Sequence, residues 1–258
     1  MVPDLQLALD AAHVADAVTL PFFRRSSLVV ETKADESPVT DADRGAEAAI
    51  RELLARERPG DGVLGEEMGI TGGSERRWFI DPIDGTRNFV RGVPVWGTLI
   101  GLEIGGSMQI GVVSAPALGR RWWAKRGEGA YARTGDGLVQ RISVSERKSL
   151  SEAGVSSGSI SHFPDPLRAL ELFNRAREGR GFGDFWQHML VAEGAIEVAL
   201  DPIVSVWDVA PLQVIVEEAG GRFTDFSGER RLDGGSAIST NAIFHDTVVS
   251  ILSGTENG

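Results

Sequence analysis

The chain has 258 residues, of which 42% are hydrophobic and 24% are charged, so it can bury a sizeable core as one large domain or two packed halves. Its net charge of −11 argues against a nucleic-acid-binding surface, because phosphate backbones are held by clustered lysines and arginines. The lack of cysteine excludes disulfides, thiolate catalysis, iron–sulfur clusters and zinc bound by sulfur.

Two sequence features bear on membranes and export. No stretch approaches the roughly 18 apolar residues that span a bilayer. Residues 1–10 carry aspartates and no basic segment, which is unlike a secretory signal. We therefore expect a cytoplasmic protein that does not contact a membrane.

The N-terminal region shows two helical patterns. Apolar residues at helical spacing predict an amphipathic helix over residues 4–20 and another that begins near Thr40. Thr40 and Asp43, three residues apart, are typical of a helix cap, and capping is the ordinary reason for an acid at such a place. Short strands are expected at residues 28–32, 63–67 and 78–80.

From residue 98 the pattern is that of β-structure. Residues 98–104 and 108–115 flank Gly105-Gly106 and predict a hairpin. Further strands are expected at residues 121–124, 129–132 and 142–144.

After residue 146 strands and helices alternate. Helices are expected at residues 166–177, 185–200 and 210–219, and residues 237–239 and 245–252 close the chain. These patterns predict a layered α/β protein. We expect one catalytic domain over residues 1–258, with an N-terminal half at 1–145 and a C-terminal half at 146–258.

The most informative segment is W-F-I-D-P-I-D-G-T-R-N-F, residues 78–89. Its apolar triplet ends a predicted strand and its proline helps fix a turn, so Asp81 and Asp84 emerge together. Gly85 and Thr86 can then present backbone N–H groups to an anion. Hard oxygen ligands beside an anion cradle predict metal-assisted attack on a phosphate ester.

Three other acids could join this pair. Asp43 opens a predicted helix, Glu66 ends a predicted strand, and Asp208 begins a C-terminal helix. Taken singly, each is explained by helix capping or by a solvated loop. Only their occurrence together indicates a metal site.

Four segments in this order resemble the inositol monophosphatase family. They are K-x-D-x-S-P-V-T-x-A-D (33–43), G-E-E (65–67), the segment 78–89, and W-D-V-A-P-L-x-x-x-x-x-E-A-G-G (207–221). The resemblance covers nearly the whole chain and implies a sugar-phosphatase fold of alternating αβαβα layers. It also implies an enzyme that requires Mg²⁺, is inhibited by lithium, and forms a homodimer.

The resemblance implies a set of metal ligands. Glu66, Asp81 and the backbone carbonyl of Ile83 match the ligands of a first Mg²⁺. Asp81, Asp84 and Asp208 match those of a second, with Asp81 bridging the two. A third, looser Mg²⁺ is expected near Glu66, which gives two to three ions per site, with Mn²⁺ as an alternative.

It also implies the residues that act on the phosphate ester. Asp43 and Thr86 match the pair that orients and deprotonates the attacking water, beside the catalytic metal at Glu66. Gly85 and Thr86 match the backbone donors to phosphate. A purely structural metal site, in a chain that only regulates a partner, would have no use for the Asp43–Thr86 pair.

Three further segments, 87–96, 114–124 and 183–188, look closer to the histidinol-phosphate phosphatase branch of the family. That substrate carries an ammonium and an imidazole, so its pocket should offer acids. We expect Asp184 and Asp201 to hold these groups, with Glu197 one helical turn before Asp201 and Trp186 packing on the ring. The alternatives are that Asp184 caps a helix and Glu197 lies on a solvated face.

The sequence therefore predicts a Mg²⁺-dependent phosphomonoesterase that hydrolyses L-histidinol phosphate in histidine biosynthesis. The alternative is an inositol-1-phosphate phosphatase or a broad sugar-phosphate phosphatase. The expected partners are a small phosphate ester and a second copy of the chain, with neither nucleic acid nor membrane.

Overall fold

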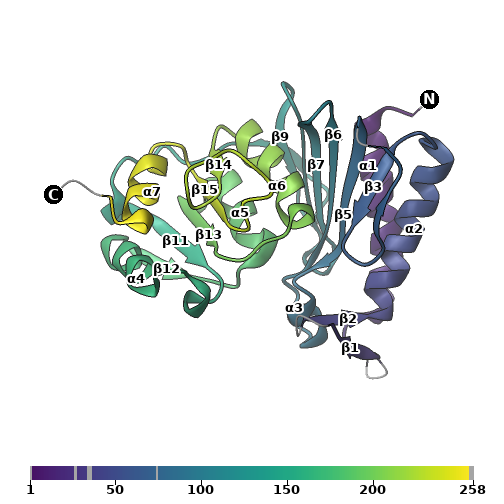
Figure 1. Ribbon diagram of the computed structural model, residues 1–258, viewed down its shortest axis with the longest axis horizontal. Coiled ribbons are helices and arrows are strands. Elements are labelled where there is room, and N and C mark those ends of the chain that lie inside the picture. The colour runs from purple at the N-terminus through teal and green to yellow at the C-terminus, as the bar shows by residue number, and fades with distance from the viewer. Residues whose placement is uncertain (1, 26–27, 34–36, 74, 256–258) are drawn as a thin grey trace.

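The computed structural model describes residues 2–25, 28–33, 37–73 and 75–255 (Figure 1). Residues 34–36 of the expected 33–43 motif lie outside this set. The molecule is built around an eight-stranded and a five-stranded sheet, with a small pair of strands beside the first. Within the described residues, no helix is long and apolar enough to cross a membrane.

The large sheet is antiparallel except where β3 runs parallel to β5. Its spatial order is β10 (Val139–Ile142), β9 (Gly129–Arg133), β8 (Arg120–Lys125), β7 (Ser107–Ala115), β6 (Gly97–Ile104), β5 (Arg76–Asp84), β3 (Gly62–Gly65) and β4 (Gly69–Thr71). The separate pair is β1 (Val30–Thr32) with β2 (Pro38–Thr40).

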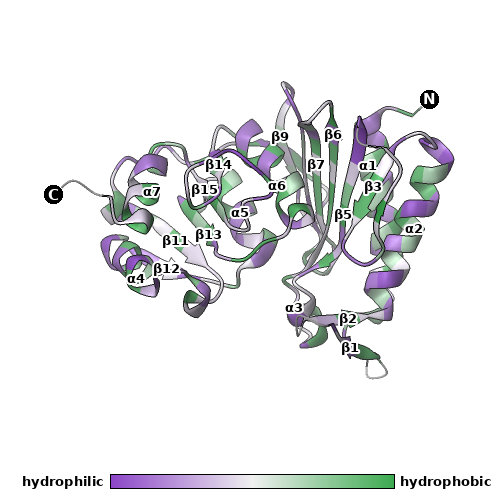
Figure 2. Cartoon of the chain, in the orientation of Figure 1, coloured by the Kyte–Doolittle hydropathy of each residue, from purple (hydrophilic) through white to green (hydrophobic). Residues whose placement is uncertain are grey.

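Side chains alternate between the two faces of the large sheet, and each face packs on helices. Trp78 and Ile80 of β5 pack with α1 (Asp4–Thr19) and α2 (Asp41–Glu57), whereas Phe79 packs with α5 (Asp184–Ala192) and α6 (Val206–Glu218). Strand alternation therefore directs Asp81, two residues after Phe79, to the α6 side. Figure 2 shows that α2 alternates between hydrophobic and hydrophilic residues along its turns, as expected for a helix with one buried face.

The small sheet lies on the far side of α5 and α6 (Figure 1). Its spatial order is β12 (Glu178–Arg180), β11 (Gly154–Ser157), β13 (Val198–Asp201), β15 (Ala237–Thr240) and β14 (Arg222–Thr224). The outer face of this sheet packs on α4 (Pro166–Arg175) and α7 (His245–Ser253). The predicted αβαβα layering is thereby confirmed.

Short helices complete the fold. They are α3 (Thr86–Val90) and the 3-10 turns Leu20–Phe22, Pro116–Leu118, Leu150–Glu152 and Ile160–His162.

One predicted element was wrong in a way that matters for the site. The helix expected at 185–200 ends at Ala192, and residues 198–201 form the strand β13 instead. Gly194, with a φ of +71°, turns the chain between them. Three apolar residues in a row do not distinguish a short strand from a buried helix, so the pattern continued the helix.

Candidate active site

Three aspartates converge where the two halves of the chain meet. Asp81 and Asp84 come from the end of β5, where the pairing with β6 shifts register, and Asp208 comes from the first turn of α6. Each offers a carboxylate oxygen, and these oxygens all lie within 4.8 Å of one another. The structure therefore brings together the residues expected to share the second metal.

Backbone donors fix these carboxylates. Ile83 N donates to Asp81 Oδ1 at 2.9 Å, and Phe185 N, at the start of α5, donates to Asp84 Oδ2 at 2.6 Å. Ser205 N donates to Asp208 Oδ2 at 2.7 Å within a capping box. Each acid retains a second oxygen for a ligand.

The cluster has the electrostatics of a cation site. Burial, followed by the charges of neighbouring carboxylates, raises the pKa of Asp81 and Asp84 well above the usual value of 3.8. Burial likewise raises the pKa of Asp208 to about 7. Buried like charges cannot all stay ionised without compensation, so the cluster fits a divalent cation held by oxygen.

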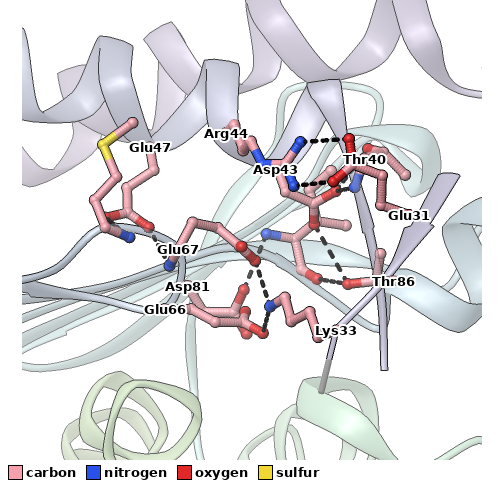
Figure 3. Close-up of polar contacts among 12 residues, drawn as sticks. Glu31, Lys33, Thr40, Asp43, Arg44, Glu47, Glu66, Glu67, Asp81 and Thr86 are labelled. Atoms are coloured by element: carbon pink, nitrogen blue, oxygen red, sulfur yellow. Dashed lines mark hydrogen bonds and ion pairs between the residues drawn. The ribbon is translucent and has the colours of Figure 1, made fainter. Parts of the chain in front are cut away.

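Glu66 extends the cluster toward the N-terminal half. Glu66 N donates to Ile80 O at 3.1 Å, which continues the parallel pairing of β3 with β5 and sets Glu66 beside Asp81. Lys33 Nζ lies 2.7 Å from Glu66 Oε1 and 2.6 Å from Glu67 Oε1 (Figure 3). A lysine thus neutralises the outer edge of the acidic cluster.

Asp43 and Thr86 contact each other, as Figure 3 shows. Thr86 Oγ1 lies 3.4 Å from Asp43 Oδ1 and 2.8 Å from the carbonyl oxygen of Ile83. Thr40 donates to Asp43 Oδ2 through its backbone N at 2.8 Å and its hydroxyl at 2.6 Å. Asp43 therefore both caps α2 and contacts Thr86, and burial raises its pKa to about 6.

Gly85 lies where the backbone leaves no room for a side chain. Its φ is +81°, and a Cβ at this position would lie 3.1 Å from Val95 O and 3.2 Å from Asp184 Oδ2. The turn after Asp84 therefore requires glycine.

A cavity of about 870 Å³ opens over these residues. Glu66, Gly85 and Thr86 line it from the N-terminal half, and Asp184 and Asp201 line it from the C-terminal half. The cavity is also lined by five residues to which the sequence analysis gave no individual role: Arg87, Arg91, His162, Phe182 and Ile203.

Asp184 faces this cavity from a strained position. Its φ is +55°, which non-glycine residues rarely adopt and which is often found at functional sites. Gly183 is the N-cap residue of α5, and the Asp184 carboxylate instead accepts a hydrogen bond from Asn88 Nδ2 at 3.2 Å. Burial, followed by the charge of Asp201, raises the pKa of Asp184 to about 7.

The structure places Glu197 away from the cavity. Because residues 198–201 form a strand, Glu197 and Asp201 lie at opposite ends of it, about 13 Å apart along the chain. Glu197 is fully buried and accepts hydrogen bonds from Gly154 N, Ser145 Oγ and Arg147 Nη1. Its role is to join segments of the fold, which corrects both the pocket and the solvated-face interpretations.

Trp186 also lies elsewhere than expected. Its ring packs edge-on against Trp122, at 5.9 Å between centroids, and beside Phe185. Among the described residues, those that line the cavity do not include Trp186. Asp184 and Trp186 are two residues apart on a helix, so their side chains point in different directions.

Sequence reasoning missed two supporting residues. Asn88 Nδ2 contacts Asp184 and Val95 O, and His188 Nε2 lies 2.9 Å from Asp201 Oδ2. Both lie in segments, 87–96 and 183–188, whose likeness to one branch of the family was noted. That likeness was the available signal, but it does not say which side chains contact the acids.

Comparison with known proteins agrees with this geometry. The family model described as the inositol monophosphatase family matches residues 3–253. The chain belongs to the inositol monophosphatase family. Histidinol-phosphatase of Mycobacterium tuberculosis is 49% identical over 253 residues, covering 96% of this chain and 97% of that protein. Histidinol-phosphatase of Streptomyces coelicolor is 45% identical, covering 96% of each.

Solved structures of the family share the fold. The inositol monophosphatase TM1415 of Thermotoga maritima has a TM-score of 0.83 at 32% identity, covering 97% of this chain and 95% of that one. The protein SuhB of Bartonella henselae has a TM-score of 0.87 at 28% identity, covering 96% and 97%.

Proposed function

We propose that this protein is a Mg²⁺-dependent phosphomonoesterase that hydrolyses L-histidinol phosphate to L-histidinol and phosphate in histidine biosynthesis. The observation that carries the proposal is a single cavity with a metal-type carboxylate cluster at one end and the acids Asp184 and Asp201 at the other. The names of the relatives from M. tuberculosis, S. coelicolor and Chlorobaculum parvum, at 44–49% identity, support the same substrate.

The metal ligands in this proposal are Glu66, Asp81, the carbonyl of Ile83, Asp84 and Asp208. They would hold two to three Mg²⁺ ions, or Mn²⁺ as an alternative. Bound Mg²⁺ supplies Lewis acidity toward the phosphoryl oxygens and lowers the pKa of a coordinated water. The buried, mutually repelling carboxylates fit this group because its charge compensates theirs.

Asp43 and Thr86 are proposed to orient the attacking water and take its proton. Asp43 Oδ2 is held by Thr40, which leaves Oδ1 toward the Thr86 hydroxyl. When that hydroxyl donates to Asp43, its lone pairs can accept from water. With a pKa of about 6, Asp43 is mostly ionised at neutral pH and can accept a proton.

The remaining groups would hold the two ends of the substrate. The backbone N–H groups of Gly85 and Thr86 are proposed to bind the phosphate. Asp184 and Asp201 are proposed to bind the ammonium and imidazole, because opposite charges in a desolvated pocket attract strongly. A neutral polyol such as inositol offers these acids no charge to pair with.

The variant Asp184→Asn tests whether Asp184 selects the substrate. Asparagine tolerates a positive φ and can keep the contact with Asn88, so Asp184→Asn removes charge with little change in shape. We expect its kcat/KM on L-histidinol phosphate to fall about 10- to 100-fold, while any activity on inositol 1-phosphate changes less than about 3-fold. Asp233→Asn, which alters an exposed carboxylate, is the control.

Two outcomes would contradict the proposal. One is a wild-type enzyme that prefers inositol 1-phosphate, which would favour the inositol-phosphatase alternative. A relative from Thermotoga maritima, 36% identical, is named fructose-1,6-bisphosphatase/inositol-1-monophosphatase. The other is an equal loss on both esters in Asp184→Asn, which would show that Asp184 does not select the substrate.

We also propose that the whole chain acts as one catalytic domain, that it forms a homodimer, as implied by the family resemblance, and that it works in the cytoplasm. Light scattering coupled to size-exclusion chromatography measures the oligomeric state. A mass of twice the 27.7 kDa chain is expected.

A further inference from the structure

A fully buried histidine lies directly behind the substrate end of the cavity. His188 belongs to α5, the helix between the two sheets. Its Nε2 lies 2.9 Å from Asp201 Oδ2 on β13, and its Nδ1 lies 2.6 Å from Ser239 Oγ on β15. One imidazole thus joins a helix to two neighbouring strands of the small sheet.

The hydrogen-bond partners of His188 determine which of its ring nitrogens carries the proton. An ionised carboxylate can only accept hydrogen bonds, so Nε2 of His188 must carry a proton and donate to Asp201. The Ser239 hydroxyl can then donate to Nδ1, which fixes both the tautomer and the orientation of the ring. A fully buried ring held at both nitrogens has one orientation, so its contact with Asp201 is preorganised.

The two oxygens of the Asp201 carboxylate face different groups. Oδ2 faces His188, whereas Oδ1 is directed toward the glycines at the cavity wall. A Cβ placed on Gly158 or Gly183 would lie 3.7 or 3.8 Å from Asp201 Oδ1. Both glycines and Asp201 line the cavity. Oδ1 is therefore the oxygen available to a bound cation.

We infer that His188, oriented by Ser239, is a positioning residue that aims Asp201 Oδ1 at the cationic part of the substrate and so sets selectivity. The inference rests on the proposed function, since it assumes that a cationic leaving group occupies this end of the cavity. His188 itself is fully buried and, among the described residues, is not part of the cavity lining.

The two reaction products, used as inhibitors, report separately on the two ends of the active site. L-histidinol probes the Asp184–Asp201 end, and inorganic phosphate probes the metal end. In the Mg²⁺-loaded enzyme, we expect His188→Leu to raise the KM for L-histidinol phosphate and the inhibition constant of L-histidinol about 10- to 100-fold. Its kcat and the inhibition constant of phosphate should stay within about 3-fold of wild type.

A pair of amide variants gives a test that does not depend on the leucine variant folding. In His188→Gln the amide nitrogen can reach the place of Nε2 and donate to Asp201, whereas the shorter side chain of His188→Asn cannot. We expect the inhibition constant of L-histidinol to stay near the wild-type value in His188→Gln and to rise in His188→Asn.

His245→Leu is the matched control. His245 is equally buried and contacts two threonines, Thr224 and Thr240, but it lies outside the set of described residues that line the cavity. Its replacement should lower the Tm and leave the inhibition constant of L-histidinol unchanged. A merely structural role for His188 predicts the same behaviour at both positions.

The outcomes separate this inference from the proposed function. If wild-type enzyme neither hydrolyses L-histidinol phosphate nor is inhibited by L-histidinol, the proposed function is wrong and the inference fails with it. If wild type does both, but His188→Asn and His188→Gln have equal inhibition constants for L-histidinol, only the positioning role is overturned.

Discussion

At the scale of single residues, Asp43 serves the fold and the site at once. One of its oxygens accepts two hydrogen bonds from Thr40 at the start of α2, and the other faces Thr86. A residue that caps a helix can therefore also take part in catalysis, and the two interpretations of an acid at a helix start do not exclude each other.

The two roles of Asp43 can be separated by Asp43→Asn. The amide oxygen can still accept from Thr40, so we expect the Tm to change by only a few degrees. The amide cannot accept a proton from water, so kcat should fall about 100-fold or more. Circular dichroism melts and initial rates measure the two quantities. A variant with a wild-type rate would exclude Asp43 as the proton acceptor.

At the scale of elements, the position of α6 depends on small residues in the large sheet. A Cβ on Gly111 of β7 would lie only 2.2 Å from Pro211 O of α6, and one on Gly101 of β6 would lie 3.3 Å from Pro211 N. Because α6 carries Asp208, this close packing also sets where the metal ligand lies.

Gly111→Ala tests this packing. The added methyl group collides with backbone, which cannot move aside as a side chain can, so we expect a loss of about 2–4 kcal/mol in the free energy of unfolding. Gly73→Ala is the control, because a Cβ there meets no described atom within 4 Å. Urea denaturation measures both, and equal stability of the two variants would contradict this account of α6.

The same scale shows what could be predicted from the sequence. Asp81 and Asp84 were predictable as a pair because they lie three residues apart where an apolar strand ends. The expected proline turn between them was wrong, since both acids lie within β5 and a register shift in its pairing with β6 separates them. Glu197 was misplaced because Val198, Ala199 and Leu200 fit a buried helix as well as a strand. The contact of His188 with Asp201 depends on that strand folding back under α5, which local periodicity does not record.

At the scale of the whole molecule, the acidic site links stability to pH and metal. Burial raises the pKa of Asp184 and Asp208 to about 7 and that of Asp43 to about 6, from the usual 3.8. The folded protein therefore binds more protons than the unfolded chain between about pH 4 and 7. Without metal, the contribution of these three acids to stability should be fully present below this window and be lost as the pH rises through it.

Bound Mg²⁺ should offset this loss. We expect the Tm of the EDTA-treated protein to fall between pH 5 and pH 8, and saturating Mg²⁺ to raise the Tm more at pH 8 than at pH 5. Groups outside the acidic site titrate in the same way with and without Mg²⁺. The difference in Tm between Mg²⁺-saturated and EDTA-treated protein at one pH therefore reports on the acidic site. An equal Mg²⁺ effect at both pH values would show that these acids are not the ligands.

The central claim is that carboxylates from distant parts of the chain form a metal site that hydrolyses L-histidinol phosphate. Asp84→Asn removes one charge from the cluster and keeps the acceptor for Phe185 N. The direct measurement is phosphate release from L-histidinol phosphate by wild type and Asp84→Asn, each with Mg²⁺ and with EDTA. The account predicts release only by wild type with Mg²⁺. Release by the variant at a comparable rate, or by wild type in EDTA, would contradict it.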